Sequence, residues 1–323
     1  MKISNIDLGD KPIFLAPMED VTDPSFRFIC KHFGADMMYT EFVSSDGLIR
    51  DAQKTLQKLN IYDYERPIGI QLYGHLTDAM VESARIAEAA KPDLIDINFG
   101  CPVRKIAGRG AGSGMMREPD KLVEMTRQIV RAVKLPVTVK TRLGWDGDSK
   151  IIVELAERLQ DVGIAALAIH GRTRAQLYKG DADWTLIGKV KDNPRMKIPI
   201  IGNGDIDGPV KAKESFDKYG VDGVMVGRAT YGRPWIFREI RHYLSTGELL
   251  PEPTVKQRVE LAKLHLSKSI EVKGERVGIL EMRRHFSSYF KALPNFKDTR
   301  MTLVTSLDVE ELNHTLSYIE QTW

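Results

Sequence analysis

Polar and reactive side chains recur in this sequence at one kind of position, directly after short apolar runs rich in β-branched residues. If these runs form parallel strands, their carboxyl ends meet on one side of the sheet, and the residues that follow can act together. One lysine or histidine at such a position would mean little, but nearly every run is followed by such a group. The residues at these positions are Ala16, Pro17, Met18, Glu41, Gln71, Asn98, Cys101, Lys140, Arg142, His170, Arg172, Asn203, Gly204, Asp205, Gly227 and Arg228. Their number predicts a catalytic or binding site.

Two short glycine-bearing segments, 202–205 and 227–229, follow the last two apolar runs. Backbone N–H groups beside glycine can approach an anion closely, and Arg228 adds a charged donor. In parallel barrels the loops after strands seven and eight commonly bind phosphate. The alternative is that these glycines only allow tight turns. We favour phosphate binding, which would suit either a phosphorylated substrate or a flavin mononucleotide.

Lys140 ends an otherwise apolar run, so its ammonium group is expected in partly desolvated surroundings. It could act as a Schiff-base nucleophile, or as a fixed cation facing an anionic ring such as reduced flavin. A salt bridge to Glu41 or another carboxylate is the structural alternative. Gln71 carries donors and acceptors that would suit the amide edge of the same ring. His170 is either a structural hydrogen-bonding residue or a ligand-binding one, and we favour the second interpretation.

The two cysteines have different surroundings. Cys30 lies in an amphipathic helical pattern and is expected in the core, whereas Cys101 lies between Gly100 and Pro102 on a predicted loop. This loop position favours a functional thiol. No CxxC pair exists, so no metal site is predicted. The glycine run at 108–114 lacks the spacing of a dinucleotide fingerprint, and we interpret it as a mobile flap over the site.

Eight apolar runs alternate with longer amphipathic stretches, which predicts a parallel sheet covered by helices on both faces. Eight such units in about 240 residues fit a closed (β/α)8 TIM barrel. An open doubly wound sheet is the alternative, but it would need a switch-point crevice and usually has fewer strands. The runs span residues 13–16, 37–40, 68–72, 94–98, 137–140, 166–170, 198–201 and 223–226.

The pattern changes after Trp235. Residues 254–323 show apolar positions at helical spacing and no convincing strand, and Pro251 and Pro253 precede them. We therefore predict an α/β barrel domain over residues 1–247 and a small all-α domain over residues 248–323.

The composition is that of an ordinary globular protein, with 42% hydrophobic and 28% charged residues in a chain of 323. Two cysteines argue against a secreted disulfide scaffold. The N-terminus lacks a signal-peptide pattern, and no apolar run approaches the roughly 18 residues of a membrane span, so we predict a cytoplasmic protein. The net charge of +3 permits a nucleic-acid partner without requiring one.

Ten segments of the chain resemble the tRNA-dihydrouridine synthase family, and the resemblance extends over essentially the whole sequence. The most specific are DINFGCPVRKI (96–106), with its asparagine–glycine–cysteine–proline element, and the HGRTR-type segment HGRTRAQLYKGDADW (170–184). The segment 281–285 resembles the bacterial branch of the family. The other matching segments are APMEDVTD (16–23), TEFV (40–43), QLYG (71–74), GAGSGMMREP (110–119), VKTRLGW (139–145), GNGDI (202–206) and MVGRA (225–229).

The resemblance implies an FMN-dependent reduction of a specific uridine in the tRNA D-loop to 5,6-dihydrouridine, with NADPH as reductant. It implies that Pro17 and Met18, next to Ala16, cover the flavin ring, with Gln71 and Lys140 at its polar edge. The residues implied to hold the ribityl chain and phosphate are His170, Asn203, Gly204, Asp205, Gly227 and Arg228. Asn98 and Arg142 are implied to orient the flipped uracil. The other residues expected to contact the tRNA substrate are Glu41, Arg172 and Gln176, and Arg283 and Arg284 in the helical domain.

The chemistry of the residues agrees with this implication. The uracil double bond is conjugated to a carbonyl, so hydride can add at carbon 6 while negative charge develops at carbon 5 and the carbonyl. The Cys101 thiol stays mostly protonated at neutral pH and can donate the proton to carbon 5. Arg142 can stabilise the developing charge by a charge-assisted hydrogen bond.

Two other functions fit parts of the pattern. Another FMN barrel, such as a dehydrogenase of free dihydropyrimidines or dihydroorotate, would explain the phosphate loops but not the helical domain. A flavin-free RNA-binding or phosphate-sugar barrel protein is the second alternative. We expect a monomer that binds tRNA and neither DNA nor membranes.

Overall fold

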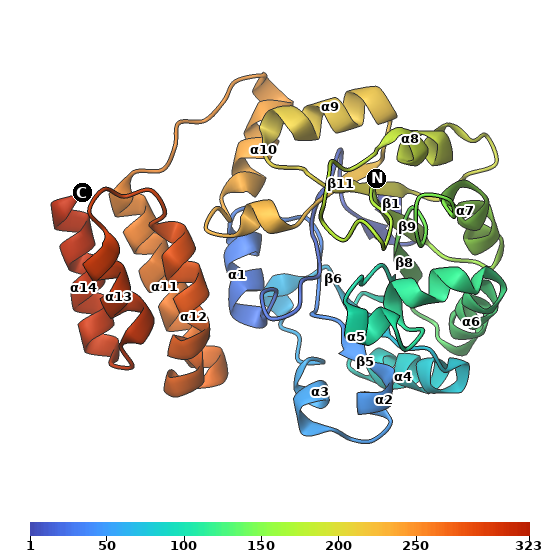
Figure 1. The fold of residues 1–323 in the computed structure, drawn as a ribbon, viewed down its shortest axis with the longest axis horizontal. Helices are drawn as coiled ribbons and strands as arrows, with labels where there is room; N and C mark the ends of the chain where they lie inside the picture. The colour runs from blue at the N-terminus through green and yellow to red at the C-terminus, as the bar shows by residue number, and fades with distance from the viewer.

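Eight parallel strands close a barrel in the computed structural model, which describes residues 1–323 (Figure 1). Neighbouring strands follow the order β3-β11-β10-β9-β8-β7-β6-β4, and a bridge between Phe14 and Met37 brings the first and last of these together. The short β5 (Val43–Ser44) also pairs with β6. The predicted TIM barrel is confirmed. Its strands are β3 (Ile13–Leu15), β4 (Met38–Tyr39), β6 (Ile68–Tyr73), β7 (Leu94–Phe99), β8 (Val137–Arg142), β9 (Ala166–His170), β10 (Ile200–Asn203) and β11 (Gly223–Val226).

Helices cover the outside of the barrel, and a continuous apolar core lies between them and the strands. Local signals set where they begin: Asp23 caps the first of them by accepting hydrogen bonds from the N–H groups of Ser25 and Phe26, and Pro24 occupies its first turn. The outer helices are α1 (Pro24–His32), α2 (Ser45–Leu48), α3 (Gln53–Gln57), α4 (Thr77–Ala89), α5 (Arg104–Ala107), α6 (Pro119–Ala132), α7 (Ile152–Asp161), α8 (Thr185–Asp192), α9 (Pro209–Tyr219) and α10 (Ile236–Thr246). Three 3-10 helices, η1 (Asp63–Glu65), η2 (Gly112–Arg117) and η3 (Arg228–Thr230), lie in the connecting loops.

A hairpin not predicted from the sequence closes the end of the barrel away from the strand carboxyl ends. Its strands, β1 (Lys2–Ile3) and β2 (Ile6–Asp7), pair antiparallel. Ile3 and Leu8 pack with Phe14 and Met225 in an apolar cluster inside the barrel. The opposite end, where the polar strand-end residues lie, is left as the mouth of the barrel.

The remaining helices form a bundle beside the barrel, at the left of Figure 1. Gly247 ends α10 in the left-handed conformation, at φ +76°, and an irregular segment leads to a capping box at Thr254. The bundle has its own apolar cluster, which also takes in Ile29 of α1 and Trp235. Its helices are α11 (Val255–Lys273), α12 (Glu275–Tyr289), α13 (Lys297–Thr305) and α14 (Val309–Thr322). The expected C-terminal helices are present, and the domain limit at 247/248 stays a prediction.

None of the helices has both the length and the apolar character that crossing a lipid bilayer requires.

Candidate active site

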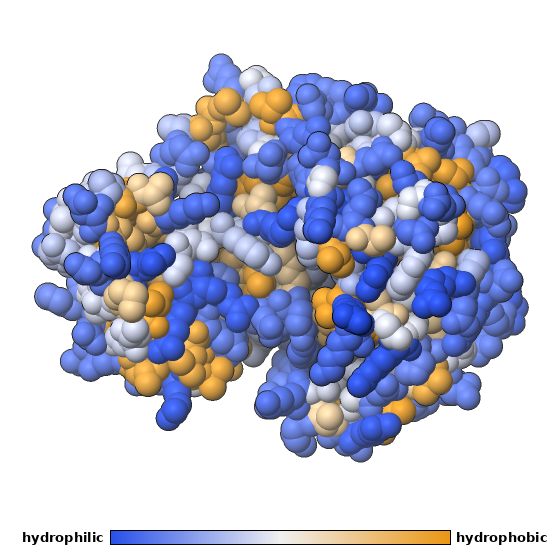
Figure 2. All heavy atoms as spheres, in the orientation of Figure 1, coloured by the Kyte–Doolittle hydropathy of each residue, from blue (hydrophilic) through white to orange (hydrophobic).

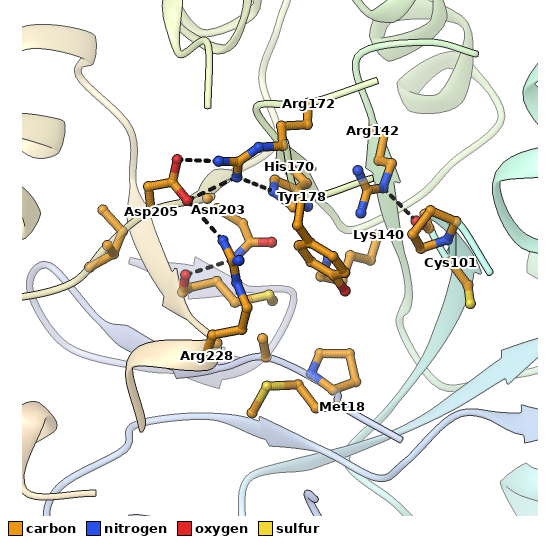
Figure 3. Close-up of a pocket in the computed structure, with 18 of the residues that line it drawn as sticks. Met18, Cys101, Lys140, Arg142, His170, Arg172, Tyr178, Asn203, Asp205 and Arg228 are labelled. Atoms are coloured by element: carbon orange, nitrogen blue, oxygen red, sulfur yellow. Dashed lines mark hydrogen bonds and ion pairs between the residues drawn. The ribbon is translucent and has the colours of Figure 1, made fainter. Parts of the chain in front are cut away.

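A cavity of about 750 Å³ lies at the carboxyl ends of the strands. Figure 3 shows Arg172 and Arg228 converging on Asp205 at one side of it and Cys101 at the other, with Lys140 and Tyr178 between. The structure therefore brings most of the residues singled out in the sequence around one space. The predicted residues that line the cavity are Ala16, Pro17, Met18, Asn98, Cys101, Lys140, Arg142, His170, Arg172, Asn203, Gly204, Asp205, Gly227 and Arg228.

Two arginines and an aspartate form an ion-pair network at one end of the cavity. Arg172 donates to both Asp205 carboxylate oxygens, at 2.8 and 2.6 Å, and Arg228 donates to Oδ1 at 3.0 Å. Burial opposes ionisation of Asp205, but the hydrogen bonds and charge of Arg172 lower its pKa overall. Arg172 is almost fully buried, whereas the Arg228 side chain is 49% exposed and faces the cavity. Arg228 can therefore reach an anion, and Arg172 holds the carboxylate that positions it.

The glycine at 204 is required by close packing beside this network. Gly204 has φ +119°, and a Cβ there would lie 2.8 Å from Cβ of Ala182 and from the His170 ring. Its carbonyl accepts a hydrogen bond from the Trp184 indole N–H at 2.9 Å. Close packing therefore requires a glycine here, and anion binding by the backbone of this loop stays a prediction.

His170 is a neutral hydrogen-bond acceptor at the cavity wall. Burial, with the nearby positive charges of Arg142 and Lys140, holds its pKa well below the usual range. Arg172 can only donate, so its contact with His170 Nε2 at 3.3 Å makes Nε2 the acceptor and places the ring proton on Nδ1. His170 can therefore offer one N–H donor to a ligand.

Lys140 is a partly buried cation on the cavity floor. Burial, assisted by the charge of Arg142, lowers its pKa to about 8, so it remains mostly charged at neutral pH. The carboxylate whose charge acts on it is Asp96. Glu41 instead accepts a hydrogen bond from the Asp20 N–H at 2.7 Å, so the salt bridge to Glu41 considered from the sequence is not formed.

A chain of hydrogen bonds through the barrel interior fixes the loop that carries Cys101. Asp96 accepts hydrogen bonds from Thr138 at 2.5 Å and from the Gln71 amide at 2.6 Å. Gln71 accepts from the Asn98 amide at 2.8 Å, and Asn98 Oδ1 accepts from the N–H of Cys101, also at 2.8 Å. Gln71 is completely buried under the cavity, and Asn98 uses its oxygen within the protein. Both residues therefore position the thiol loop.

The glycine run packs against the Cys101 loop instead of forming the flap we expected. Gly112, at φ +54°, begins η2, and a Cβ there would lie 3.1 Å from the Cys101 Cβ. The Ser113 hydroxyl donates to the Cys101 carbonyl at 2.7 Å, and residues 111–116 are buried. The flap prediction failed because these glycines allow close packing rather than motion. Burial raises the pKa of Cys101, which keeps it a thiol at neutral pH.

Arg142 is buried on the cavity wall near Cys101, with one nitrogen left over. Its Nε donates to the Gly100 carbonyl at 2.8 Å, and Nη1 donates to the carbonyls of Thr173 and Leu177 at 3.0 and 2.9 Å. Nη2 is the guanidinium nitrogen without a protein partner. This geometry leaves Arg142 one charged donor for a ligand.

Several predicted substrate residues lie away from the cavity. Gln176 accepts a hydrogen bond from the Thr173 N–H at 2.8 Å and stabilises a turn. Glu41 orders the loop that carries Met18 and does not line the cavity. Arg283 donates to the Thr305 carbonyl at 3.0 Å within the bundle, whereas Arg284 is exposed.

Comparison with known proteins shows the family to which the chain belongs. Residues 14–322 match the family described as dihydrouridine synthase (Dus). The chain belongs to the dihydrouridine synthase family. A "probable tRNA-dihydrouridine synthase" of Rickettsia conorii is 40% identical over 301 residues, which cover 93% of this chain and 90% of that one. The "tRNA-dihydrouridine synthase B" of Xanthomonas campestris is 41% identical over 300 residues, with coverage of 93% and 90%.

Solved structures share the barrel of this dihydrouridine synthase. A 2-naphthoyl-CoA reductase complex has a TM-score of 0.58 at 12% identity and covers 75% of this chain and 51% of its own. A morphinone reductase mutant in complex with tetrahydroNAD has a TM-score of 0.52 at 11% identity, with coverage of 76% and 89%. At such identities the likeness is one of fold. Family membership makes the protein an oxidoreductase.

Tyr178 is one of the cavity residues that the sequence reasoning missed. Its ring lies between two cations, with the guanidinium carbon of Arg228 4.6 Å and that of Arg142 5.6 Å from the ring centre. It comes from the loop after β9, inside the HGRTR-type segment of this dihydrouridine synthase, but eight residues beyond the strand end at His170. Only its place within a matching segment could have drawn attention to it.

Proposed function

We propose that this dihydrouridine synthase reduces a specific uridine in the D-loop of tRNA to 5,6-dihydrouridine, using FMN and NADPH. Relatives named tRNA-dihydrouridine synthase, about 40% identical over most of the chain, support the tRNA substrate. The observation that carries the proposal is one cavity with Arg172 and Arg228 at one end and the Cys101 thiol at the other.

The residues around the cavity fit FMN. Arg228 and the backbone at Gly204 and Gly227 would hold the phosphate, and His170 and Asn203 would contact the ribityl chain. Bound FMN would supply the hydride that adds to the pyrimidine. Lys140 would supply a partly buried positive charge that stabilises negative charge on the adjacent ring, and Met18 with Pro17 would provide an apolar surface.

Cys101 and Arg142 complete the reaction at the other end of the cavity. The Cys101 Sγ donates its proton to carbon 5 of the uracil as hydride reaches carbon 6, so the double bond becomes saturated and the thiolate is reprotonated from water. Arg142 Nη2 donates a hydrogen bond to the uracil carbonyl on which negative charge develops. Gln71 and Asn98 hold the loop that carries the thiol.

The tRNA itself requires a larger surface than the cavity. We assign residues 1–247 to FMN binding and catalysis and residues 248–323 to tRNA binding, where the exposed Arg284 can contact phosphates. The target base must leave its stack to enter the barrel mouth, at a cost of a few kcal/mol.

The test uses the purified protein with unmodified tRNA, and separately with free uracil. Each is incubated with FMN and NADPH, and the tRNA is digested and analysed by mass spectrometry. We expect dihydrouridine at a D-loop position and no reduction of free uracil. Reduction of free uracil alone would favour the free-pyrimidine dehydrogenase, and a protein that binds no flavin would favour the flavin-free alternative.

A further inference from the structure

The helical bundle contacts the barrel beside the loops that form the cavity. Ser288 of α12 packs on Gly232. Gly232 follows Tyr231 and η3, the 3-10 helix that begins at Arg228, and both Arg228 and Tyr231 line the cavity. Figure 2 shows that barrel and bundle meet along part of their length and are separated by an open notch between α12 and α3. A limited number of contacts therefore sets the angle between them.

A buried ion pair lies at the other main contact. Nζ of Lys273, the last residue of α11, lies 2.6 Å from Oδ2 of Asp23, which caps the first helix of the barrel. The two side chains are 13% and 7% exposed. Burial alone would raise the pKa of Asp23, but the charge and hydrogen bond of Lys273 lower it below the usual range. Lys273 also pairs with Glu281 of α12, so it joins one barrel helix to two bundle helices.

Aromatic and polar contacts surround this ion pair. Ser25 Oγ lies 3.5 Å from Nε2 of His265, whose Nδ1 contacts the Tyr289 hydroxyl at 2.8 Å. The Phe26 ring stacks on His285 with a centroid distance of 5.0 Å. All of these side chains are buried. The first turn of α1 is thus held by groups from both α11 and α12.

Polar contacts constrain this arrangement more than apolar packing would. Apolar surfaces tolerate small rotations, whereas a buried charge must keep its partner within hydrogen-bond distance. Asp23 also lies five residues after Met18, in the same loop as part of the cavity wall. A rotation of the bundle would therefore break the ion pair and displace the bundle surface relative to the cavity mouth.

We propose that the Asp23–Lys273 ion pair, with the Ser25–His265–Tyr289 contacts, positions the helical domain so that one tRNA uridine reaches the cavity. The inference rests on the proposed function and adds these residues as positioning residues for tRNA specificity. They act through the domain angle and touch neither the base nor the flavin. Loss of the ion pair should therefore change tRNA binding and the choice of uridine, and leave flavin chemistry unchanged.

The test compares Lys273→Met with Lys273→Arg, which keeps the charge, and with Lys256→Met on the outer part of the same helix. Lys256 is 66% exposed and lies 4.0 Å from Glu320 of α14. For Lys273→Met we expect the KM for tRNA to rise about tenfold, kcat to change less, and dihydrouridine to appear at additional positions. The flavin spectrum and the rate of flavin reduction by NADPH should match wild type. Lys273→Arg should restore the wild-type KM and modification map, and Lys256→Met should not broaden the map.

Lys273→Met leaves Asp23 as an unpaired buried charge, which can prevent folding. If that variant does not bind flavin, the double variant Asp23→Asn/Lys273→Met replaces it, because it keeps a capping side chain and leaves only the 39% exposed Glu281 without its lysine partner. An unchanged KM and an unchanged map in a folded, flavin-bound variant would overturn the inference. Wild-type protein that forms no dihydrouridine in any tRNA would overturn the proposed function instead.

Discussion

The two ends of the cavity use charged and polar groups in opposite ways. Near β10 and β11, Asp205 is tied to Arg172 and Arg228, and most donors already have partners. Near β7 and β8, Lys140 lacks a paired carboxylate, Arg142 keeps one free nitrogen and Cys101 keeps its proton. The first arrangement suits holding a ligand in place, and the second suits a change of charge or proton during a reaction.

This difference explains why similar residues at strand ends have different roles. Arg142 ends β8 and Arg172 follows the neighbouring β9, and both are buried, yet Arg172 is fully occupied by Asp205, His170 and backbone carbonyls. Residue type and position in the sequence do not distinguish the roles of Arg172 and Arg142. The two side chains differ in the number of guanidinium nitrogens left without a partner, and only the folded structure gives that number.

Removing the thiol at the reactive end of the cavity should have the largest effect on the rate of uridine reduction. We expect Cys101→Ala to lower the rate of uridine reduction by about two to four orders of magnitude, because the variant lacks the proposed proton donor. FMN binding and flavin reduction by NADPH should be unchanged, since the thiol is remote from the anion-binding end. Steady-state kinetics with tRNA and a flavin titration measure both quantities.

Cys30→Ala is the matched control for this prediction. Cys30 is completely buried in α1 and does not line the cavity, so its removal should leave the chemistry intact. Full uridine turnover by Cys101→Ala would exclude the thiol as the proton donor.

Removing the exposed arginine at the other end of the cavity should weaken FMN binding, and this effect should be smaller. Arg228→Ala should lower FMN affinity about tenfold to a hundredfold, the usual cost of one charged hydrogen bond. With saturating FMN, kcat should recover most of its wild-type value. Isothermal titration with the apoprotein measures this, with Arg85→Ala on the surface of α4 as the control. A loss of kcat at saturating FMN with unchanged affinity would show that the two ends do not divide their roles in this way.

The smallest predicted effect concerns the pH dependence of the reactive end. Lys140 has a lowered pKa of about 8, so it is charged below that pH and loses its charge as the pH rises through it. The rate of flavin reduction should therefore fall about tenfold between pH 7 and pH 9. Lys140→Arg keeps its charge to higher pH and should move this decline upward by at least about one unit. The same decline in both proteins would assign it to another group.

Much of the barrel could be predicted because buried parallel strands are nearly continuous apolar runs. The predicted runs 166–170 and 223–226 coincide with β9 and β11, and most of the others differ from the observed strands by one or two residues. The hairpin β1–β2 was missed because each of its strands has only two residues, too few for any periodicity. The irregular β5 was missed for the same reason.

The site could be predicted as a set of residues, but their hydrogen-bond partners could not. Gln71 lies near the end of an apolar run, as Lys140 does, yet its amide is hydrogen-bonded to Asp96 and Asn98 beneath the cavity. Tyr178 lies in a loop, where no period connects sequence position to direction, and it reaches the cavity through contacts with Arg142 and Arg228. Such pairings join residues far apart in the sequence and depend on the folded chain.

A single-turnover experiment tests the proposed reaction most directly. The purified flavin-bound protein is reduced without oxygen, excess NADPH is removed, and unmodified tRNA is added while flavin absorbance is followed. We predict that the absorbance of oxidised flavin returns in step with the appearance of one dihydrouridine per flavin. Flavin that stays reduced in the presence of tRNA, or that is reoxidised without any dihydrouridine, would contradict transfer of hydride to a uridine held in this cavity.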